Sequence, residues 1–333
     1  MNILIRTSGG RAPKKELGLG HIYRSVNLAH FLKPNQIFFL VEDFGGSKKI
    51  INDFGYGVFL LPKNLDESSD IQKTISLIKR KKIDMVIIDK YNLKFRYVEN
   101  LFKITKVVVI SDLKNINYRC DLLVNGFIGY QNQIKLNKYG TKCLLGPNYQ
   151  ILKQDFAKRK INPRKNYDVL ITFGGFDENN ITLKVLNVLI KFSSQIKTKI
   201  ILGPTTKKTK KMESLLKKYP KNLKVISKTN NMYREISKAK FGLCAGGITS
   251  YEFAAMSLKF WIICQEKHQL ETAREWQKKG LATNLGLGTK ITSENIEKMF
   301  KFVLENKKKK MIKAGQIVDG LGGKRASNQI LKL

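Results

Sequence analysis

The sequence predicts an α/β protein made of two Rossmann-like, doubly wound domains that face each other across a cleft. Three observations lead to this prediction. The chain has 333 residues, which is long for one hydrophobic core and suits two domains of ordinary size. Short apolar runs alternate with segments of helical spacing, a pattern typical of parallel βαβ units. A basic stretch that contains Pro147 and Pro163 interrupts this alternation, and the pattern then starts again.

The first half opens with a buried strand over Asn2–Arg6, which enters a loop at Gly9, Gly10 and Pro13. Apolar residues at nearly helical spacing then predict a helix over Gly20–Leu32. We expect the other strands of this half at Ile37–Val41, Val58–Leu61, Met85–Asp89, Val107–Ser111 and Leu122–Asn125. We expect its other helices at Ser47–Phe54, Ser69–Lys81 and Phe95–Lys103. Because the strands are apolar almost without interruption, helices should cover both faces of the sheet.

The second half repeats this organisation after a connecting segment. Gly146–Lys165 has little periodicity, so we expect a first domain over 1–150, a linker over 151–165 and a second domain over 166–333. We expect strands of the second domain at Asp168–Phe173, Lys199–Leu202, Leu223–Ile226, Phe241–Cys244 and Trp261–Cys264. We expect its helices at Ile181–Ile190, Lys210–Lys218, Ser250–Met256, His268–Lys279, Ile296–Glu305, Lys309–Val318 and Ala326–Leu331.

The composition is that of a globular protein, with 42% hydrophobic and 26% charged residues. Apolar stretches such as Phe260–Cys264 are far too short to span a bilayer, and Met1–Gly10 lacks the features of a signal peptide. Four widely spaced cysteines form no CxxC pair, which argues against a zinc site and against a disulfide framework. We therefore expect a cytoplasmic protein without a transmembrane segment, and a monomer.

The formal net charge of +36 favours attraction to polyanions such as nucleic acid, an acidic membrane or phosphorylated substrates. However, the lysines are spread along the whole chain and are not gathered with aromatic residues on one element. The sequence is also rich in Lys, Ile and Asn together, so we interpret most lysines as solvated surface. We expect no specific nucleic-acid partner, whereas a peripheral contact with a membrane stays open.

The first glycine-rich loop, Leu17–His21, leads into the helix that carries Arg24. Gly18 and Gly20 let the backbone come close to a ligand, and a helix N-terminus favours negative charge. A dinucleotide fingerprint would need a glycine where Tyr23 stands, which argues against an NAD-linked enzyme. His21 alone among the three histidines lies in such a loop. By spacing alone, a role as a helix cap or surface residue is favoured for it over a catalytic one.

Two further glycine-rich loops follow strands of the second half. Gly174 and Gly175 suit a phosphate cradle formed by backbone amides, but Asp177 or Asn179 capping the next helix explains this turn equally well. Ala245–Glu252 combines two glycines, two hydroxyls and a helix start. Its acidic residue at position 252 suits either a ribose hydroxyl or the helix dipole. Two such loops in one domain favour a nucleotide diphosphate site.

Short motifs in one order from residue 5 to about residue 280 point to a known family. They are Ile5–Arg6, Gly18–Arg24 with Leu28–Ala29, Asp89–Tyr91, Cys120–Asn125, Leu145–Tyr149 with Leu152, Phe173–Asp177, Ala245–Glu252 and Gln269. This order resembles the UDP-2,4-diacetamido-2,4,6-trideoxy-β-L-altropyranose hydrolases of pseudaminic acid biosynthesis. These are relatives of the glycosyltransferase-B fold and of the lipid II N-acetylglucosaminyltransferase.

The resemblance implies a role for each matching residue. His21 would be the catalytic residue, and the sugar side of the substrate would be contacted by Arg6, Gly20, Arg24, Asp89 and Tyr91. The resemblance assigns UDP to the second domain, at Gly174, Gly175, Gly246, Gly247, Thr249, Ser250, Glu252 and Gln269. It implies no metal and no cofactor. Two features depart from the family: a longer, basic Ser8–Glu16 insert, and Phe176 where a small hydroxyl residue is usual.

The resulting hypothesis is attack of water on the anomeric carbon, with UDP leaving and the histidine as general base. The nearest alternative is a glycosyltransferase of the same fold that passes the sugar from UDP to a lipid or saccharide acceptor. We see no clear amphipathic membrane helix, which favours hydrolysis.

Overall fold

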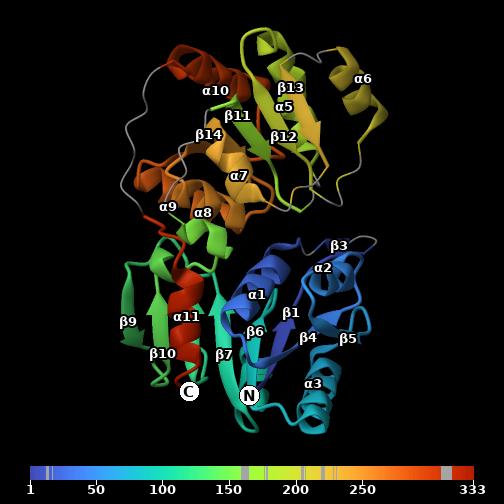
Figure 1. Cartoon of the computed structure of the whole chain (residues 1–333), viewed down its shortest axis with the longest axis vertical. Coiled ribbons are helices and arrows are strands. Elements are labelled where there is room, and N and C mark those ends of the chain that lie inside the picture. The colour runs from blue at the N-terminus through green and yellow to red at the C-terminus, as the bar shows by residue number, and fades with distance from the viewer. Residues whose placement is uncertain are drawn as a thin grey trace. The chain divides into compact units, whose positions relative to one another are not determined.

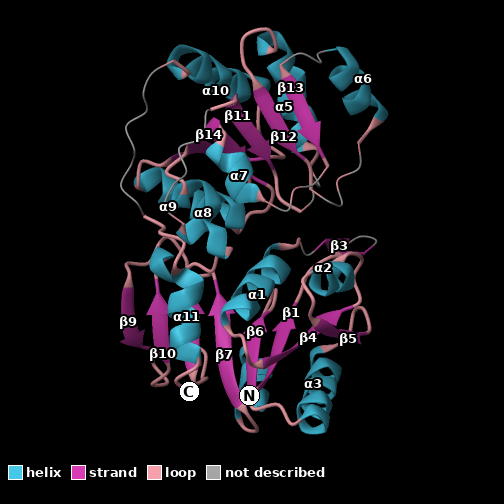
Figure 2. Cartoon of the chain, in the orientation of Figure 1, coloured by secondary structure: helices cyan, strands magenta, loops and turns pink. Residues whose placement is uncertain are grey.

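The computed structural model describes residues 1–12, 15–16, 18–158, 165–175, 177, 179–203, 206, 208–218, 222–227, 229, 231–308 and 317–333. These residues form two compact units (Figure 1). Unit 1 consists of Met1–Ala157 together with Asp319–Leu333, and unit 2 of Lys158–Val318. In each unit a sheet carries helices against its strands (Figure 2). The α/β class predicted from the sequence is confirmed.

The sheet of unit 1 has the strand order β5-β4-β1-β6-β7-β8-β10-β9. Its strands are β1 (Asn2–Thr7), β4 (Gln36–Glu42), β5 (Gly57–Leu61), β6 (Met85–Asp89), β7 (Lys106–Ser111), β8 (Leu122–Asn125), β9 (Gln133–Leu136) and β10 (Lys142–Leu145). All pairs are parallel except β9 with β10, which is antiparallel. The short strands β2 (Arg11–Ala12) and β3 (Lys15–Glu16) form a separate antiparallel hairpin within the Ser8–Glu16 insert.

Helices cover both faces of this sheet, as the uninterrupted apolar strands predict. The helices of unit 1 are α1 (Gly20–Phe31), α2 (Ser47–Asp53), α3 (Glu67–Lys81), α4 (Phe95–Phe102) and α11 (Gly322–Ile330), with 3₁₀ turns at Pro147–Tyr149 and Gln154–Ala157. Ile3 and Ile5 of β1 pack in one core cluster with residues of α1, α2 and α11. Leu4, which points to the other face, packs with residues of α3 and α4.

The last residues of the chain belong to unit 1, which corrects the expected second domain over 166–333. Helix α11 packs beside α1 (Figure 1). Ala326 and Ile330 are fully buried in the core of unit 1, so the apolar face of α11 needs that core. A Cβ at Gly322 would lie 2.1 Å from the carbonyl oxygen of Gln150, so only glycine allows this close approach.

The middle of the chain also differs from the expected boundary. Unit 1 continues to Ala157 rather than ending at residue 150. Residues 159–164 of the expected linker and most of the expected helix at Lys309–Val318 lie outside the described residues.

The sheet of unit 2 is entirely parallel, in the order β13-β12-β11-β14-β15-β16. Its strands are β11 (Tyr167–Thr172), β12 (Thr198–Ile201), β13 (Leu223–Ile226), β14 (Ala239–Cys244), β15 (Lys259–Cys264) and β16 (Ala282–Leu287). Its helices are α5 (Ile181–Leu189), α6 (Lys210–Lys218), α7 (Met232–Ser237), α8 (Ile248–Ala255), α9 (Gln269–Lys278) and α10 (Ser293–Asn306), with a 3₁₀ turn at Ile190–Phe192. Val169 and Ile171 of β11 pack with apolar residues of α5 and α10.

Both sheets contain the strand order of a doubly wound Rossmann fold. In chain order, the first six strands of each sheet lie as 3-2-1-4-5-6. The order reverses between β1 and β6 in unit 1, and between β11 and β14 in unit 2. Ligands of such sheets bind beyond the carboxyl ends of the strands at this reversal. The topology therefore directs attention to the residues that follow these four strands.

Candidate functional site

His21 stands in the first turn of α1, directly beyond the carboxyl ends of β1 and β6. The register pairs Thr7, the last residue of β1, with Asp89, the last residue of β6. His21 Nδ1 lies 2.7 Å from Asp89 Oδ1. The histidine side chain is 20% exposed, whereas that of Asp89 is 1% exposed. The imidazole is therefore anchored on its buried side and open on the other.

Asp89 is surrounded by donors from one face of α1. Arg24 donates from Nε to Oδ2 at 2.8 Å and from Nη2 to Oδ1 at 2.6 Å. The Ser25 hydroxyl donates to Oδ2 at 3.4 Å. Residues 21, 24 and 25 share this face because positions three and four apart are neighbours on a helix. With the histidine, these contacts use about the four acceptor positions of a carboxylate.

The charge of Asp89 determines which ring nitrogen of His21 carries the proton. Burial alone would raise the pKa of Asp89, but Arg24 and His21 hold it down at about 2. An ionised carboxylate only accepts hydrogen bonds, and Nδ1 lies closer to Asp89 Oδ1, at 2.7 Å, than to Arg24 Nη2, at 3.1 Å, so we assign Nδ1 as the donor to Asp89. The lone pair of a neutral His21 is then on Nε2, which is the tautomer that a general base requires.

Arg24 connects this pair to a second carboxylate. Its Nη1 donates to Asp112 Oδ2 at 2.8 Å, and its side chain is 6% exposed. Asp112 directly follows β7, the strand next to β6. Asp112 belongs to none of the motifs in the sequence. Its signal would have been an acidic residue directly after a buried strand that neighbours the reversal point.

Arg6 lies beneath the site in a buried ion-pair network. Its side chain is fully buried, and Nη2 contacts Glu42 and Asp70 at 2.8 Å each. Lys90 donates to Asp70 at 2.6 Å, and the Tyr97 hydroxyl donates to Asp70 at 3.1 Å. Burial alone would raise the pKa of Asp70, but Arg6 and Lys90 lower it to about 2. These contacts give Arg6 a structural role, and its predicted sugar contact stays a prediction.

Two other residues predicted for the sugar side differ in their surroundings. Tyr91 is 50% exposed, and its backbone N–H donates to the Ser8 hydroxyl at 2.7 Å. Gly20 begins α1, and a Cβ added there would meet no atom within 4 Å. The packing of unit 1 thus leaves space at both positions.

In unit 2, the predicted glycine pairs follow the two strands that flank the reversal of order. Gly174 and Gly175 follow β11, and Gly246 and Gly247 follow β14. Gly174 has a φ of +87°, a conformation that favours glycine. A Cβ on Gly203, which follows β12, would lie 2.1 Å from the Gly175 oxygen. Glycine residues, which have no side chain, therefore line this edge of the sheet.

Gln269 ties these strand-end loops together from the start of α9. Its Oε1 accepts from the backbone N–H of Gly246 at 3.3 Å and of Gln265 at 3.0 Å. The Gln265 side chain in turn donates to the backbone oxygen of Phe173, beyond β11. Gln265 was not predicted, because a glutamine after a strand has no motif of its own.

Several polar residues of these loops already have protein partners. Asp177 accepts from the backbone N–H of Ile181 at 2.7 Å and of Thr182 at 2.6 Å, so the helix-cap interpretation of this residue is confirmed. Ser250 is fully buried between the Gly247 oxygen and the Trp276 indole N–H. Thr249 and Glu252 are partly exposed in the first turns of α8. Phe176 lies outside the described residues.

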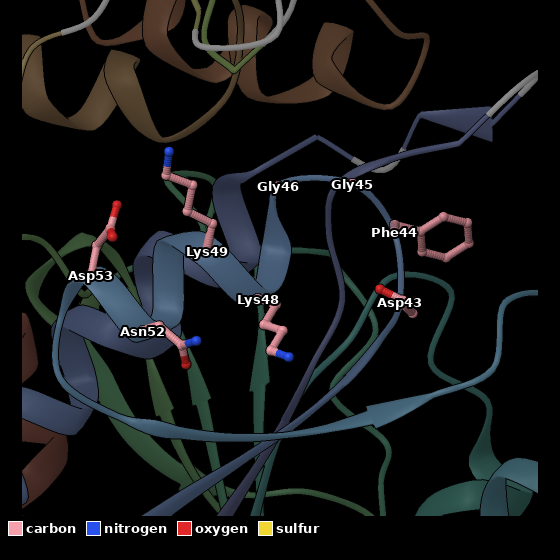
Figure 3. A pocket seen from close by; sticks show the side chains of 8 residues that line it. All are labelled: Asp43, Phe44, Gly45, Gly46, Lys48, Lys49, Asn52 and Asp53. Carbon is pink, nitrogen blue, oxygen red and sulfur yellow. The ribbon is translucent and has the colours of Figure 1, made fainter.

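A shallow hollow of about 450 Å³ lies in unit 1, over the β4–α2 connection. It is lined by Asp43, Phe44, Gly45, Gly46, Lys48, Lys49, Asn52 and Asp53 (Figure 3). Lys48 and Lys49 point in different directions, so their charges do not converge on one ligand (Figure 3).

Among the described residues, no group of three His, Cys, Asp or Glu side chains is placed to hold a metal ion. No described helix has the length and apolar character needed to cross a membrane.

Three proteins are similar in sequence over most of this chain. The uncharacterized protein MJ1062 of Methanocaldococcus jannaschii is 29% identical over 86% of this chain, which covers 60% of that protein. The spore coat polysaccharide biosynthesis protein SpsG of Bacillus subtilis is 26% identical, over 89% of this chain and 87% of SpsG. The UDP-2,4-diacetamido-2,4,6-trideoxy-β-L-altropyranose hydrolase of Campylobacter jejuni is 27% identical, over 84% of this chain and 97% of the hydrolase. The resemblance that the motifs indicate is confirmed. No protein-family model matches the chain.

Solved structures identify the fold. MurG of Acinetobacter baumannii has a TM-score of 0.67 at 14% identity, with all of both chains covered. The chain has the glycosyltransferase-B fold. MnaA of S. aureus, solved with UDP, has a TM-score of 0.63 at 13% identity, over 99% of this chain and 96% of MnaA. At these identities the likeness carries the fold and not the reaction.

Proposed function

We propose that this chain is a UDP-sugar hydrolase that cleaves the anomeric C–O bond of a UDP-linked diacetamido-trideoxy sugar without a metal ion. The observation that carries the proposal is the pair of His21 and Asp89, 2.7 Å apart at the strand-order reversal of unit 1. The name of the Campylobacter relative supplies the substrate class. Free sugar and UDP would be the products, for the biosynthesis of a pseudaminic-type acid.

The reaction needs one base and one anion site. A water oxygen attacks the anomeric carbon while the bond to the diphosphate oxygen breaks, and UDP departs with the bonding electron pair. Nε2 of His21 takes the proton that the attacking water loses. Asp89 acts as a positioning residue, because it holds Nδ1–H and stabilises the imidazolium that forms. Such general-base assistance contributes roughly 10²–10⁴ in rate.

Unit 2 would hold the nucleotide. The glycine pairs at Gly174–Gly175 and Gly246–Gly247 stand beyond the strands where a diphosphate binds in this topology, and the Gly246 N–H already donates to Gln269, so its contribution would be close backbone approach rather than a donor. Helix α8 begins at Ile248 without a side-chain cap, and the Ser250 amide donates to the Gly247 oxygen, so the amides of Ile248 and Thr249 would face an anion. Thr249 and Glu252 would contact the diphosphate and the ribose, whereas Ser250 and Gln269 would act by holding the loop.

A glycosyltransferase is the second candidate, because MurG and the rhamnosyltransferase SpnG share the fold. In that reaction an acceptor hydroxyl replaces water, and the same histidine takes its proton. The two candidates differ only in the group that attacks the anomeric carbon. Supplying candidate acceptors together with the UDP-sugar therefore separates them.

The test is to incubate the protein with a panel of UDP-sugars and CMP-sugars in EDTA and to follow free nucleotide by proton NMR. We expect UDP from the diacetamido-trideoxy sugar in the absence of any acceptor. The His21→Asn variant should bind UDP nearly as well as the wild type while turnover falls about a hundredfold or more. Unchanged turnover in that variant would remove His21 from the mechanism, and release of UDP only with an acceptor would establish the transferase.

A further inference from the structure

The cluster around Arg24 contains two carboxylates that differ in accessibility. Asp89 is the last residue of β6 and Asp112 directly follows the neighbouring strand β7, so both lie at the carboxyl edge of the sheet. The side chain of Asp89 is 1% exposed, whereas that of Asp112 is 44% exposed. A ligand in front of His21 can therefore reach Asp112 and not Asp89.

The two carboxylates also differ in free hydrogen-bonding capacity. The oxygens of Asp89 already accept from His21, from Arg24 twice and from Ser25. Asp112 accepts from Arg24 through Oδ2, and among the described residues no donor to its Oδ1 is found. A carboxylate has about four acceptor positions, so Asp112 retains most of its own for another partner.

The charges of the cluster do not require Asp112. Arg24 carries one positive charge, and the two-point contact with Asp89 already balances it. Burial and the neighbouring Asp89 act to raise the pKa of Asp112, but Arg24 and His21 lower it overall. Asp112 is thus ionised near neutral pH and leaves the cluster with a net negative charge when His21 is neutral. Such a charge repels a diphosphate and attracts neutral hydrogen-bond donors.

From these observations we propose that Asp112 binds the sugar of the substrate by accepting a hydrogen bond from a ring hydroxyl or an acetamido N–H. This inference rests on the proposed function, because it takes a UDP-sugar as the ligand. It moves the sugar contact that the sequence predicted for Asp89 to the neighbouring carboxylate, and it leaves Asp89 to position His21. Arg24 then serves both carboxylates and fixes the distance between the base and the sugar-binding group.

The experiment compares Asp112→Asn with Asp43→Asn. Asp43 is an exposed aspartate that directly follows β4 at the same edge of the sheet, so the control has the same chemistry without Arg24. Dissociation constants for UDP and for UDP-2,4-diacetamido-2,4,6-trideoxy-β-L-altropyranose are measured by calorimetry in a His21→Asn background, which prevents turnover. KM and kcat are measured in the otherwise native protein, and thermal melting checks that each variant folds.

We expect Asp112→Asn to raise Kd and KM for the UDP-sugar about tenfold, while Kd for UDP and the melting temperature stay unchanged. Asp43→Asn should change none of these values. A fall in kcat with unchanged KM would mean that Asp112 acts only through Arg24, and it would overturn the sugar contact, as would no change at all. If the wild type releases no UDP, the proposed hydrolysis fails, and the ratio of the two Kd values still decides the role of Asp112.

Discussion

At the scale of single residues, the site depends on the ionisation of one buried carboxylate. Asp89 can orient His21 only while it is charged, because only then must Nδ1 be the donor. The family resemblance implied that residues 21, 24 and 89 belong to one site. It could not indicate their division of labour, which depends on side-chain directions across the sheet.

Asp89→Asn tests this division of labour. The amide has the size of the carboxylate, but its NH₂ group can donate to Nδ1 and stabilise the tautomer with the proton on Nε2. We expect kcat for UDP release to fall by roughly 10²–10⁴, with Kd for UDP unchanged. A kcat within about threefold of the wild type would contradict the assigned tautomer.

Arg6 presents a different case, because its removal takes a buried cation away from two acids at once. In Arg6→Met, Glu42 and Asp70 lose a partner in a buried place, and we expect a loss of about 3–5 kcal/mol in the free energy of unfolding. Urea denaturation measures this change. Lys94→Met is the matched control, because Lys94 is 64% exposed and 4.0 Å from its partner Glu67, and it should cost less than about 1 kcal/mol. Equal losses in the two variants would show that the buried ion pairs of Arg6 contribute no more to stability than the exposed ion pair of Lys94.

At the scale of elements, the strand-end loops of unit 2 combine tight packing with open backbone. Gly246 and Gly247 are consecutive, yet their surroundings differ. A Cβ on Gly246 would lie 2.8 Å from Cβ of Gln269 and 3.0 Å from its backbone oxygen, whereas a Cβ on Gly247 would meet nothing within 4 Å. The first glycine is required by packing, and the second is free for a ligand.

Two alanine substitutions separate these roles. Without ligand, we expect Gly246→Ala to cost about 1–3 kcal/mol in the free energy of unfolding, and Gly247→Ala less than about 1 kcal/mol. With UDP present, Gly247→Ala should show a smaller rise in melting temperature than the wild type, because its methyl group would stand where phosphate oxygens approach the amides, whereas the methyl group of Gly246→Ala is directed at Gln269 and should leave most of that rise in place. A full UDP-induced rise in Gly247→Ala would exclude this loop from the nucleotide site.

At the scale of the whole molecule, the two doubly wound halves could be predicted, but the departures from that plan could not. Runs of β-branched and apolar residues located the central strands, because those strands are buried on both faces. β9 escaped prediction because it has only four residues and its two apolar side chains, Ile134 and Leu136, are exposed rather than part of a buried run. The return of α11 to unit 1 also left no local signal, since its apolar face would suit the core of either unit.

Acid sensitivity follows from the two buried carboxylates of unit 1. Asp70 and Asp89 each have a pKa of about 2 in the folded protein, against about 3.9 in an unfolded chain. Because the folded pKa is the lower one, their stabilisation is complete above about pH 5 and is lost as the pH falls through 4 towards 2. Each contributes about 2 kcal/mol by this linkage.

We therefore expect the urea midpoint to be steady from pH 7 to pH 5 and to fall steeply between pH 4 and pH 2. The net charge of +36 adds a repulsion that also grows as carboxylates are protonated, so the wild-type curve alone does not isolate these two groups. Asp89→Asn isolates one of them. Below pH 2 the variant has nearly the same total charge as the wild type, but above pH 2 it lacks the pH-dependent stabilisation that the lowered pKa of Asp89 provides. Its loss of stability between pH 5 and pH 2 should be smaller than that of the wild type by about 2 kcal/mol. Parallel curves for the two proteins would show that the pKa of Asp89 is the same in the folded and unfolded chains, and that Arg24 does not hold its charge.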